Sequence, residues 1–110
     1  MSIAADLIRG HTDAVILSVL MRRDSYGYDI NKTILLSSGG AYELKEATLY
    51  TAFKRLEDAG AVSSYWGDEN TGARRKYYTI TDKGKEMYRQ LYSDWENAKC
   101  IIDSLMYKEK

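Results

Sequence analysis

The sequence predicts a mainly α-helical fold with one small β-hairpin, and three observations lead to this prediction. Apolar residues recur at helical spacing in three segments between residues 12 and 59. Two short segments rich in β-branched and aromatic residues follow, and they flank a polar loop that contains glycines. A last segment, up to about residue 107, again repeats its apolar residues every three or four positions. This order is that of a winged helix-turn-helix with a long C-terminal dimerisation helix.

Composition is consistent with one globular domain that contains no membrane segment. The chain has 110 residues, of which 45% are hydrophobic and 29% charged, and no proline. No apolar run approaches the roughly 18 residues that span a bilayer. The first residues lack the charged start, long apolar core and cleavage site of a secretory signal. We therefore expect a cytoplasmic protein.

The sequence offers little for metal or catalytic chemistry. A single cysteine, Cys100, cannot form an intrachain disulfide, and with a single histidine, His11, it leaves too few ligands for a zinc or copper site. The chain has no glycine-rich phosphate loop, no paired-carboxylate motif and no nucleophile with an adjacent base. We therefore expect no metal, no cofactor and no enzymatic activity.

Two helices are predicted in the first part of the chain. The first runs from Thr12 to Arg22, because its apolar residues form one stripe and Thr12 is placed to cap its start. The second follows Ser25, which can cap it, and ends at the glycine pair of residues 39–40. Gly27, in the first turn of the second helix, is expected to permit close packing against the first.

A third helix is predicted from about Glu46 to Ala59, ended by Gly60, after a short segment at residues 42–44 that is expected to pair as a strand. Its core face is expected to consist of Leu49, Ala52, Phe53 and Leu56. Its opposite face carries Ala47, Tyr50, Thr51, Lys54 and Arg55. A helix of this length fits a DNA major groove, where such side chains reach base edges or phosphates. The alternative is a solvated face on an ordinary core helix.

A hairpin is predicted from strands at residues 62–66 and 75–80. Its loop contains Gly67, Asp68, Asn70 and Gly72. The return strand opens on three basic residues, Arg74, Arg75 and Lys76. At the tip of a hairpin they would meet phosphates or the negative potential of the minor groove. The alternative is a charged strand edge that protects the sheet against aggregation.

The distribution of charge favours DNA binding although the net charge does not. The 16 basic and 16 acidic residues cancel, and phosphate neutralisation supplies much of the affinity for DNA. Five basic residues nevertheless lie within twelve positions, namely Arg74, Arg75, Lys76, Lys83 and Lys85. The aromatic residues of the hairpin are expected to pack within the fold instead of stacking on unpaired bases: Tyr65, Trp66, Tyr77 and Tyr78.

The last helix is predicted to run from Thr81 to about Tyr107 and to pair with a second copy of the chain. Residues 1–80 are expected to form a winged helix-turn-helix DNA-binding domain that buries its own helices and hairpin, so residues 81–110 would have little core left to cover. The apolar stripe of this dimerisation helix consists of Met87, Leu91, Trp95, Ala98, Ile102 and Leu105. Trp95 suits a flat ligand in an effector pocket, and the alternative is a tryptophan that fills the interface.

Five segments in combination resemble the PadR family of bacterial transcriptional regulators. They are RGHTDAVILSVL, YGYDINKTI, ELKEATLYTAFKRLEDAG, SYWGDENTGARRKYY and ITDKGKE, and they extend from residue 9 to about residue 90. The resemblance implies a winged-helix homodimer that represses nearby genes by binding a pseudo-palindromic operator in double-stranded DNA. It also implies release of the DNA by small molecules.

The resemblance carries particular roles to positions in this chain. DNA contacts are implied for Tyr26, Tyr28, Thr48, Tyr50, Lys54, Arg55, Arg74, Arg75 and Lys76. The single helix after the wing is similar to that of the short subfamily, in which drug-binding members use a tryptophan of this helix, here Trp95, in a cavity at the dimer interface. The other implied walls of that cavity are Leu7, Asp13, Ala14, Leu91 and Lys99. The resemblance thus implies a planar aromatic effector. A lysine one turn after Trp95 would oppose a planar cation, so selectivity for cations is not expected.

A second functional hypothesis is a winged-helix protein-interaction module that does not bind DNA directly. The net charge of zero keeps this alternative open. The two hypotheses differ in the dependence of binding on salt, because each neutralised phosphate steepens that dependence.

Overall fold

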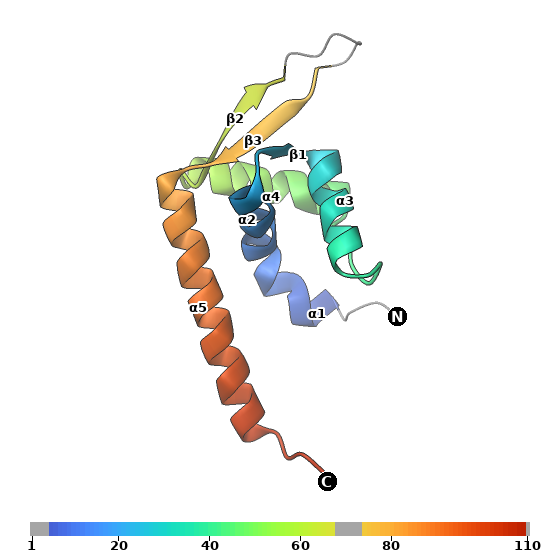
Figure 1. Cartoon of the computed structure of the whole chain (residues 1–110), viewed down its shortest axis with the longest axis vertical. Coiled ribbons are helices and arrows are strands. Elements are labelled where there is room, and N and C mark those ends of the chain that lie inside the picture. The colour runs from blue at the N-terminus through green and yellow to red at the C-terminus, as the bar shows by residue number, and fades with distance from the viewer. Residues whose placement is uncertain (1–4, 68–73, 110) are drawn as a thin grey trace.

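The computed structural model describes residues 5–67 and 74–109, and Figure 1 shows how its elements are arranged. Three helices, α2, α3 and α4, gather beside a small sheet, a hairpin projects away from them, and the last helix extends in the opposite direction. This confirms the expected fold class. The elements are α1 (Ala5–Ile8), η1 (Arg9–His11), α2 (Thr12–Arg22), β1 (Ser25–Tyr26), α3 (Gly27–Ser37), α4 (Glu46–Asp58), β2 (Val62–Trp66), β3 (Lys76–Ile80) and α5 (Asp82–Leu105).

The core lies between the inner face of α4, helices α2 and α3, and the sheet. The four α4 residues that were predicted to face the core are all buried. Phe53 stacks on Tyr78 of β3 with ring centroids 4.0 Å apart and an interplanar angle of 20°. Both rings are almost fully buried, with exposed fractions of 1% for Phe53 and 3% for Tyr78. This contact fixes α4 against β3, which begins at Lys76, directly after Arg74 and Arg75.

The sheet has a third strand that the sequence did not predict. Its order is β1-β3-β2, and β1 pairs antiparallel with β3. Ser25 was expected to cap the second helix, and this was wrong: Ser25 lies in β1, is 1% exposed, and donates its hydroxyl hydrogen to Asp29. By pairing with the open edge of β3, the backbone of Ser25 and Tyr26 gains hydrogen-bond partners within the sheet. In a helix cap, the same backbone groups would have been left to solvent. The Ser25 hydrogen bond, with help from Arg23, lowers the pKa of Asp29.

No strand forms at residues 42–44, contrary to expectation. The side chain of Asn31 takes the place of a strand partner there. Its amide nitrogen donates to the carbonyl oxygen of Leu44 at 2.7 Å, and its amide oxygen accepts from the Leu44 N–H at 2.8 Å. These two bonds hold the α3–α4 connection, so its backbone needs no neighbouring strand.

Two details of the first helices also differ from expectation. Thr12 does not cap α2, because α1 and η1 precede it and the Thr12 hydroxyl donates to the Arg9 carbonyl oxygen at 3.2 Å. The close approach at Gly27 is to α4 and not to α2. A Cβ atom there would lie 2.9 Å from the Tyr50 hydroxyl oxygen and 3.6 Å from Leu49.

Helix α5 is anchored at its start to the corner between α4 and β2. Thr81 caps it by accepting a hydrogen bond from the Gly84 N–H at 3.0 Å. The same hydroxyl donates to the carbonyl oxygen of Gly60 at 2.6 Å. A Cβ atom on Gly84 would lie only 2.0 Å from the Ala61 carbonyl oxygen, so glycine permits this close approach. None of the helices in the described ranges is long and apolar enough to cross a membrane.

The Gly84→Ala substitution is expected to destabilise the fold by about 2 to 3 kcal/mol, because the added methyl group overlaps backbone that cannot rotate away. Urea unfolding measures the change. Gly10→Ala is the matched control, since a Cβ atom there meets no described heavy atom within 4 Å. Equal unfolding midpoints for Gly84→Ala and the parent protein would contradict the anchoring of α5.

Candidate nucleic-acid interface

The outer face of α4 is open to solvent, as predicted. Its exposed residues are Ala47, Thr48, Tyr50, Thr51, Lys54, Arg55 and Asp58. Tyr50 is fixed by an edge contact with Phe53, at 5.6 Å between centroids, although half of its surface is exposed. Lys54 lies 3.7 Å from Asp58 in an ion pair on the same helix. The small residues in the first half of α4 leave space for a close approach by another molecule. The long polar residues further along provide hydrogen-bond donors.

Arg55 is held by a carboxylate from another helix. Its Nε donates to Asp13 Oδ2 at 3.2 Å, and its Nη2 donates to Asp13 Oδ1 at 2.5 Å. This two-point contact raises the pKa of Arg55 and links α2 to α4. The sequence assigned these two residues to different sites, Arg55 to DNA and Asp13 to an effector cavity. The structure brings them together instead.

The basic residues at the start of the return strand each lie over an aromatic ring. Arg74 is 5.7 Å from the Trp66 ring, Arg75 is 4.7 Å from the Tyr26 ring, and Lys76 is 5.7 Å from the Tyr78 ring. All three basic side chains are exposed. The loop residues Asp68, Asn70 and Gly72 lie outside the described residues. Rings beneath the cations restrict the positions that these flexible side chains adopt.

A row of three tyrosines crosses the sheet next to these cations. Tyr26, Tyr77 and Tyr65 are direct neighbours in the strand register. The centroids are 5.3 Å apart for Tyr26 and Tyr77 and 5.6 Å apart for Tyr65 and Tyr77. At the far end, Tyr65 donates to Asp24 at 2.7 Å, and this bond raises the pKa of Tyr65. Of the four hairpin rings that were expected to pack within the fold, Tyr78 is buried and Tyr77 is half-buried, whereas Tyr65 and Trp66 remain 44% and 56% exposed.

Tyr28, the other tyrosine to which the resemblance assigned a DNA contact, projects from the first turn of α3 and is 71% exposed. Its neighbour Gly27 touches Tyr50, so the start of α3 lies against the first half of α4. The structure thus brings Tyr26, Tyr28 and Tyr50 to one region. The row through Tyr26 was missed, because the sequence gave no sign that β1 exists.

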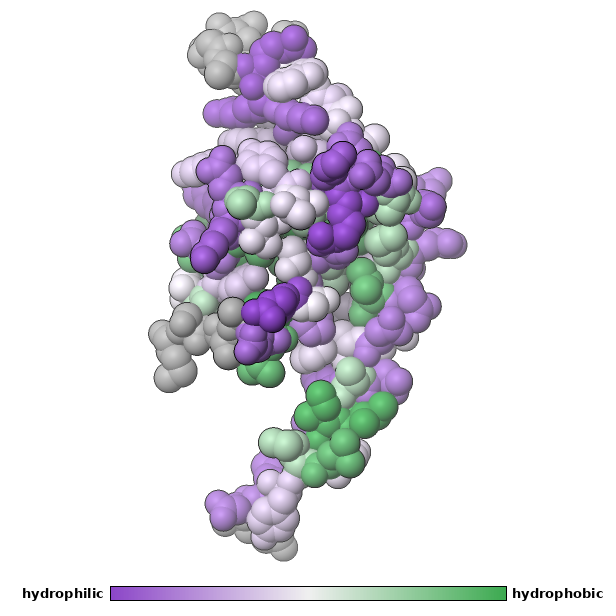
Figure 2. All heavy atoms as spheres, turned by 180° about the vertical axis from the view of Figure 1, so that it is seen from behind, coloured by the Kyte–Doolittle hydropathy of each residue, from purple (hydrophilic) through white to green (hydrophobic). Residues whose placement is uncertain are grey.

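The apolar stripe of α5 is covered only in its first half. Met87 and Leu91 are half-buried against the core. Further along, the exposed fraction rises from 43% at Trp95 to 53% at Ile102 and 78% at Leu105. Figure 2 shows hydrophobic residues gathered on the free part of this helix. Within residues 5–67 and 74–109, the second half of this stripe is exposed to solvent.

Trp95 lies edge-on against His11, with ring centroids 5.0 Å apart. The sequence gave His11 no role beside Trp95. Of the other residues implied to line a cavity, Leu7 is 72% exposed, Ala14 and Leu91 are half-buried, and Lys99 pairs with Glu96 at 3.1 Å. Hydrogen bonding to Lys99 lowers the pKa of Glu96.

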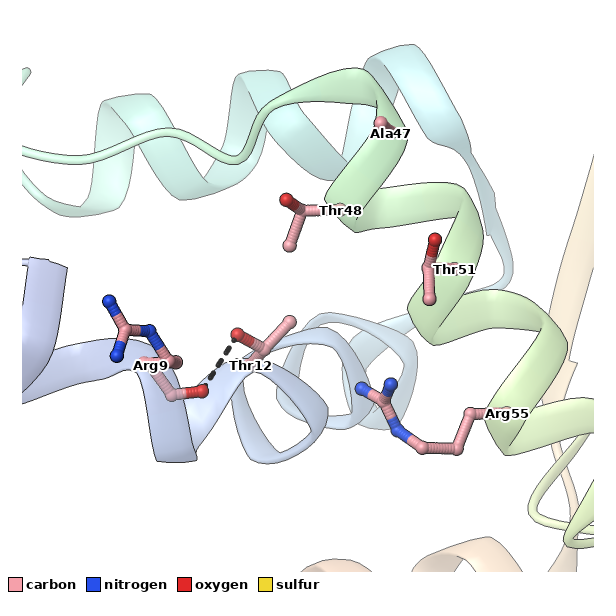
Figure 3. A pocket seen from close by; sticks show the side chains of 6 residues that line it. All are labelled: Arg9, Thr12, Ala47, Thr48, Thr51 and Arg55. Carbon is pink, nitrogen blue, oxygen red and sulfur yellow. Dashed lines mark hydrogen bonds between the residues drawn. The ribbon is translucent and has the colours of Figure 1, made fainter.

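A hollow of about 350 Å³ lies between η1 and α4. Figure 3 shows α4 on one side and the η1–α2 junction on the other, with the Thr48 side chain directed toward the gap. Arg9 pairs with Asp6 at 2.8 Å on the surface of this region. Six residues line the hollow: Arg9, Thr12, Ala47, Thr48, Thr51 and Arg55. The sequence gave no reason to place Arg9 beside α4.

Comparison with known proteins gives consistent matches. The model of the transcriptional regulator PadR-like family matches residues 16–90. A transcriptional regulator of known structure from Clostridium thermocellum is 45% identical, with a TM-score of 0.88 over 96% of this chain and 99% of that one. Uncharacterized protein X of Lysinibacillus sphaericus is 41% identical over 94% of this chain and 95% of its own length. The negative transcriptional regulator PadR of Bacillus subtilis is 31% identical over 84% of this chain and 52% of its own length.

Proposed function

Because this chain belongs to the PadR-like family of transcriptional regulators, we propose that it is a homodimeric repressor that reads DNA with α4 and the basic start of β3. One observation carries this proposal. The buried contact between Phe53 and Tyr78 joins α4 to β3, and β3 begins at Lys76, directly after Arg74 and Arg75. A helix and a wing held in this way can contact a groove and its bordering backbone together.

The proposal gives α4 the role of the reading helix. With 13 residues it is about 20 Å long, and the major groove, about 12 Å wide, admits such a helix. Ala47 and Thr51 leave room for close approach to base edges. Thr48, Tyr50, Lys54 and Arg55 supply donors for bases or phosphates, and Tyr28 at the start of α3 supports them at the backbone.

The dimer is proposed to form through α5. The exposed part of its stripe, from Trp95 to Leu105, is large and apolar for a surface that stays in water. A second copy that covers it would place two α4 helices on one face of the duplex. The half-sites of a pseudo-palindromic operator would then be about 34 Å apart.

An effector site is proposed around Trp95 at the same interface. A ring that is 43% exposed in the single chain and has an edge contact with His11 offers a flat surface for a planar aromatic molecule. Leu7, Ala14, Leu91 and Lys99 are its proposed walls. Asp13 fits this role less well, because it is bound to Arg55. Effector binding would change the spacing of the two reading helices.

The contact surface can be tested with a Lys54→Ala, Arg75→Ala double variant. Loss of two phosphate contacts is expected to weaken binding to the DNA upstream of its own gene at least tenfold and to lower the salt slope by about 2. Gel-shift titrations at several salt concentrations measure both. An Arg89→Ala, Lys108→Ala variant removes the same charge from α5 and the tail beyond it. Unchanged affinity of the first variant would contradict the assigned surface, and salt-independent binding by the parent protein would favour the protein-interaction module.

Two substitutions at Tyr26 separate its ring from its hydroxyl. Tyr26→Leu removes the ring beneath Arg75, so affinity for the same DNA is expected to fall about three- to fivefold, which matches a cation–π contact of roughly 0.5 to 1 kcal/mol. Tyr26→Phe keeps the ring and is expected to bind like the parent. Fluorescence anisotropy with labelled duplex measures both. A loss in Tyr26→Phe equal to that in Tyr26→Leu would instead assign the hydroxyl to a DNA contact.

The effector site predicts quenching of tryptophan fluorescence by planar aromatic compounds. Trp95→Ala is expected to abolish the quenching while Trp66 continues to emit. Quenching that persists unchanged in Trp95→Ala would rule out this pocket. A repressor that binds no effector would show no specific quenching in the parent protein.

A further inference from the structure

We propose that the hollow between η1 and α4 binds a phosphate group of the DNA backbone, and that Arg9 is the residue that reaches it. This inference rests on the proposed reading of DNA by α4. It assigns a second backbone contact, on the side of α4 away from the wing. Arg9 lies outside the contact residues that the sequence resemblance implies.

The two flanks of α4 face different parts of the molecule. On one flank, Tyr50 touches Gly27 and Glu57 accepts a hydrogen bond from Ser64 of β2, so this flank faces the sheet and wing. On the other flank, Thr48 and Arg55 line the hollow beside η1. A helix in the major groove lies between two phosphate backbones. If the flank of α4 that faces the β2–β3 hairpin lies next to one phosphate backbone, η1 on the opposite flank lies next to the other phosphate backbone.

The hollow has the chemistry of a phosphate contact. Each of the six residues that line it is neutral or positively charged. Its two arginines come from opposite walls, and the Thr48 and Thr51 side chains stand on α4 between them (Figure 3). Guanidinium groups are planar donors that match phosphate oxygens, and threonine hydroxyls commonly add to such contacts.

The carboxylates next to the hollow do not block it. Arg9 and Asp6 form an i,i+3 pair on the surface, with side chains 75% and 86% exposed, and such pairs contribute little. Arg9 can therefore exchange Asp6 for a phosphate. Asp13 binds Arg55 through Nε and Nη2, and Nη1 takes no part in these two bonds. Asp13 thus positions the Arg55 guanidinium and leaves some of the N–H donors of that guanidinium outside these two bonds.

The openness of the site favours a backbone phosphate over a free anion. The Arg9 side chain is 75% exposed, and an exposed, screened contact holds a small ion weakly. A phosphate that is part of a duplex already bound by α4 is presented at high local concentration. The hollow therefore adds affinity once the helix lies in the groove.

The test compares Arg9→Gln with Arg89→Gln, which removes the same charge from an exposed position of α5. Arg9→Gln is expected to bind the upstream DNA about five- to tenfold more weakly, with a salt slope lower by about 1. Arg89→Gln is expected to match the parent. Thermal unfolding of both variants shows whether the fold is kept, and Arg9→Lys, which retains the charge, is expected to restore most of the slope.

Ethylation interference locates the contact. In the parent protein we expect one interfering phosphate per half-site across the major groove from those at the wing, and in Arg9→Gln this interference is lost. Parent-like affinity and interference in Arg9→Gln would overturn the inference while leaving the proposed function intact. A parent protein that binds no DNA would overturn the proposed function and this inference with it.

Inorganic phosphate distinguishes the two sources of the ligand. At matched ionic strength and without DNA, replacing chloride by phosphate is expected to raise the unfolding temperatures of the parent protein and of Arg9→Gln by the same amount, because phosphate stabilises folded proteins generally. Stabilisation by phosphate that is smaller in Arg9→Gln would show a site for a free anion, and it would overturn the assignment to the DNA backbone.

Discussion

The stacking of Phe53 on Tyr78 holds the outer face of α4 in a fixed relation to the hairpin. The two rings are 4.0 Å apart in the core, and burial raises the pKa of Tyr78. Because Phe53 and Tyr50 touch on the same helix, a shift of the core ring would also move the exposed face. Gly60, Thr81 and Gly84 tie the start of α5 to the same corner. Helix α4, the sheet and the start of α5 are therefore positioned from one place in the core.

Charge in this molecule is organised locally, which explains how a chain with no net charge presents a basic surface. Asp13 binds Arg55, Asp6 binds Arg9 and Asp58 binds Lys54 around α4. The pairs of Arg9 and Lys54 are exposed and weak, so phosphates can compete for these two cations. The two-point contact with Asp13 holds Arg55 in place. At the start of β3, aromatic rings lie beneath the cations. A ring restricts a cation without neutralising it, and the potential that attracts DNA is kept.

The sequence predicted the features that follow from periodicity. Helical spacing identified α2, α3, α4 and α5, and the buried face of α4 was confirmed residue by residue. Two-residue β1 has no period to detect, and its formation depends on the free edge of β3. The contact between Asp13 and Arg55 joins residues 42 positions apart, and neither pattern nor propensity indicates such a pair. Of the nine expected contact residues, eight are exposed and Tyr26 is half-buried, whereas their contacts with DNA stay predictions.

The central claim is that α4 and the basic start of β3 form one DNA-binding surface. Amide chemical-shift mapping by NMR, with a short duplex from the DNA upstream of the gene, tests it most directly. The account predicts that the shifts concentrate at residues 47–55 and 74–76 in the same titration, while the amides of residues 98–105 stay in place. Shifts confined to α5, or no shifts with any duplex at low salt, would contradict it.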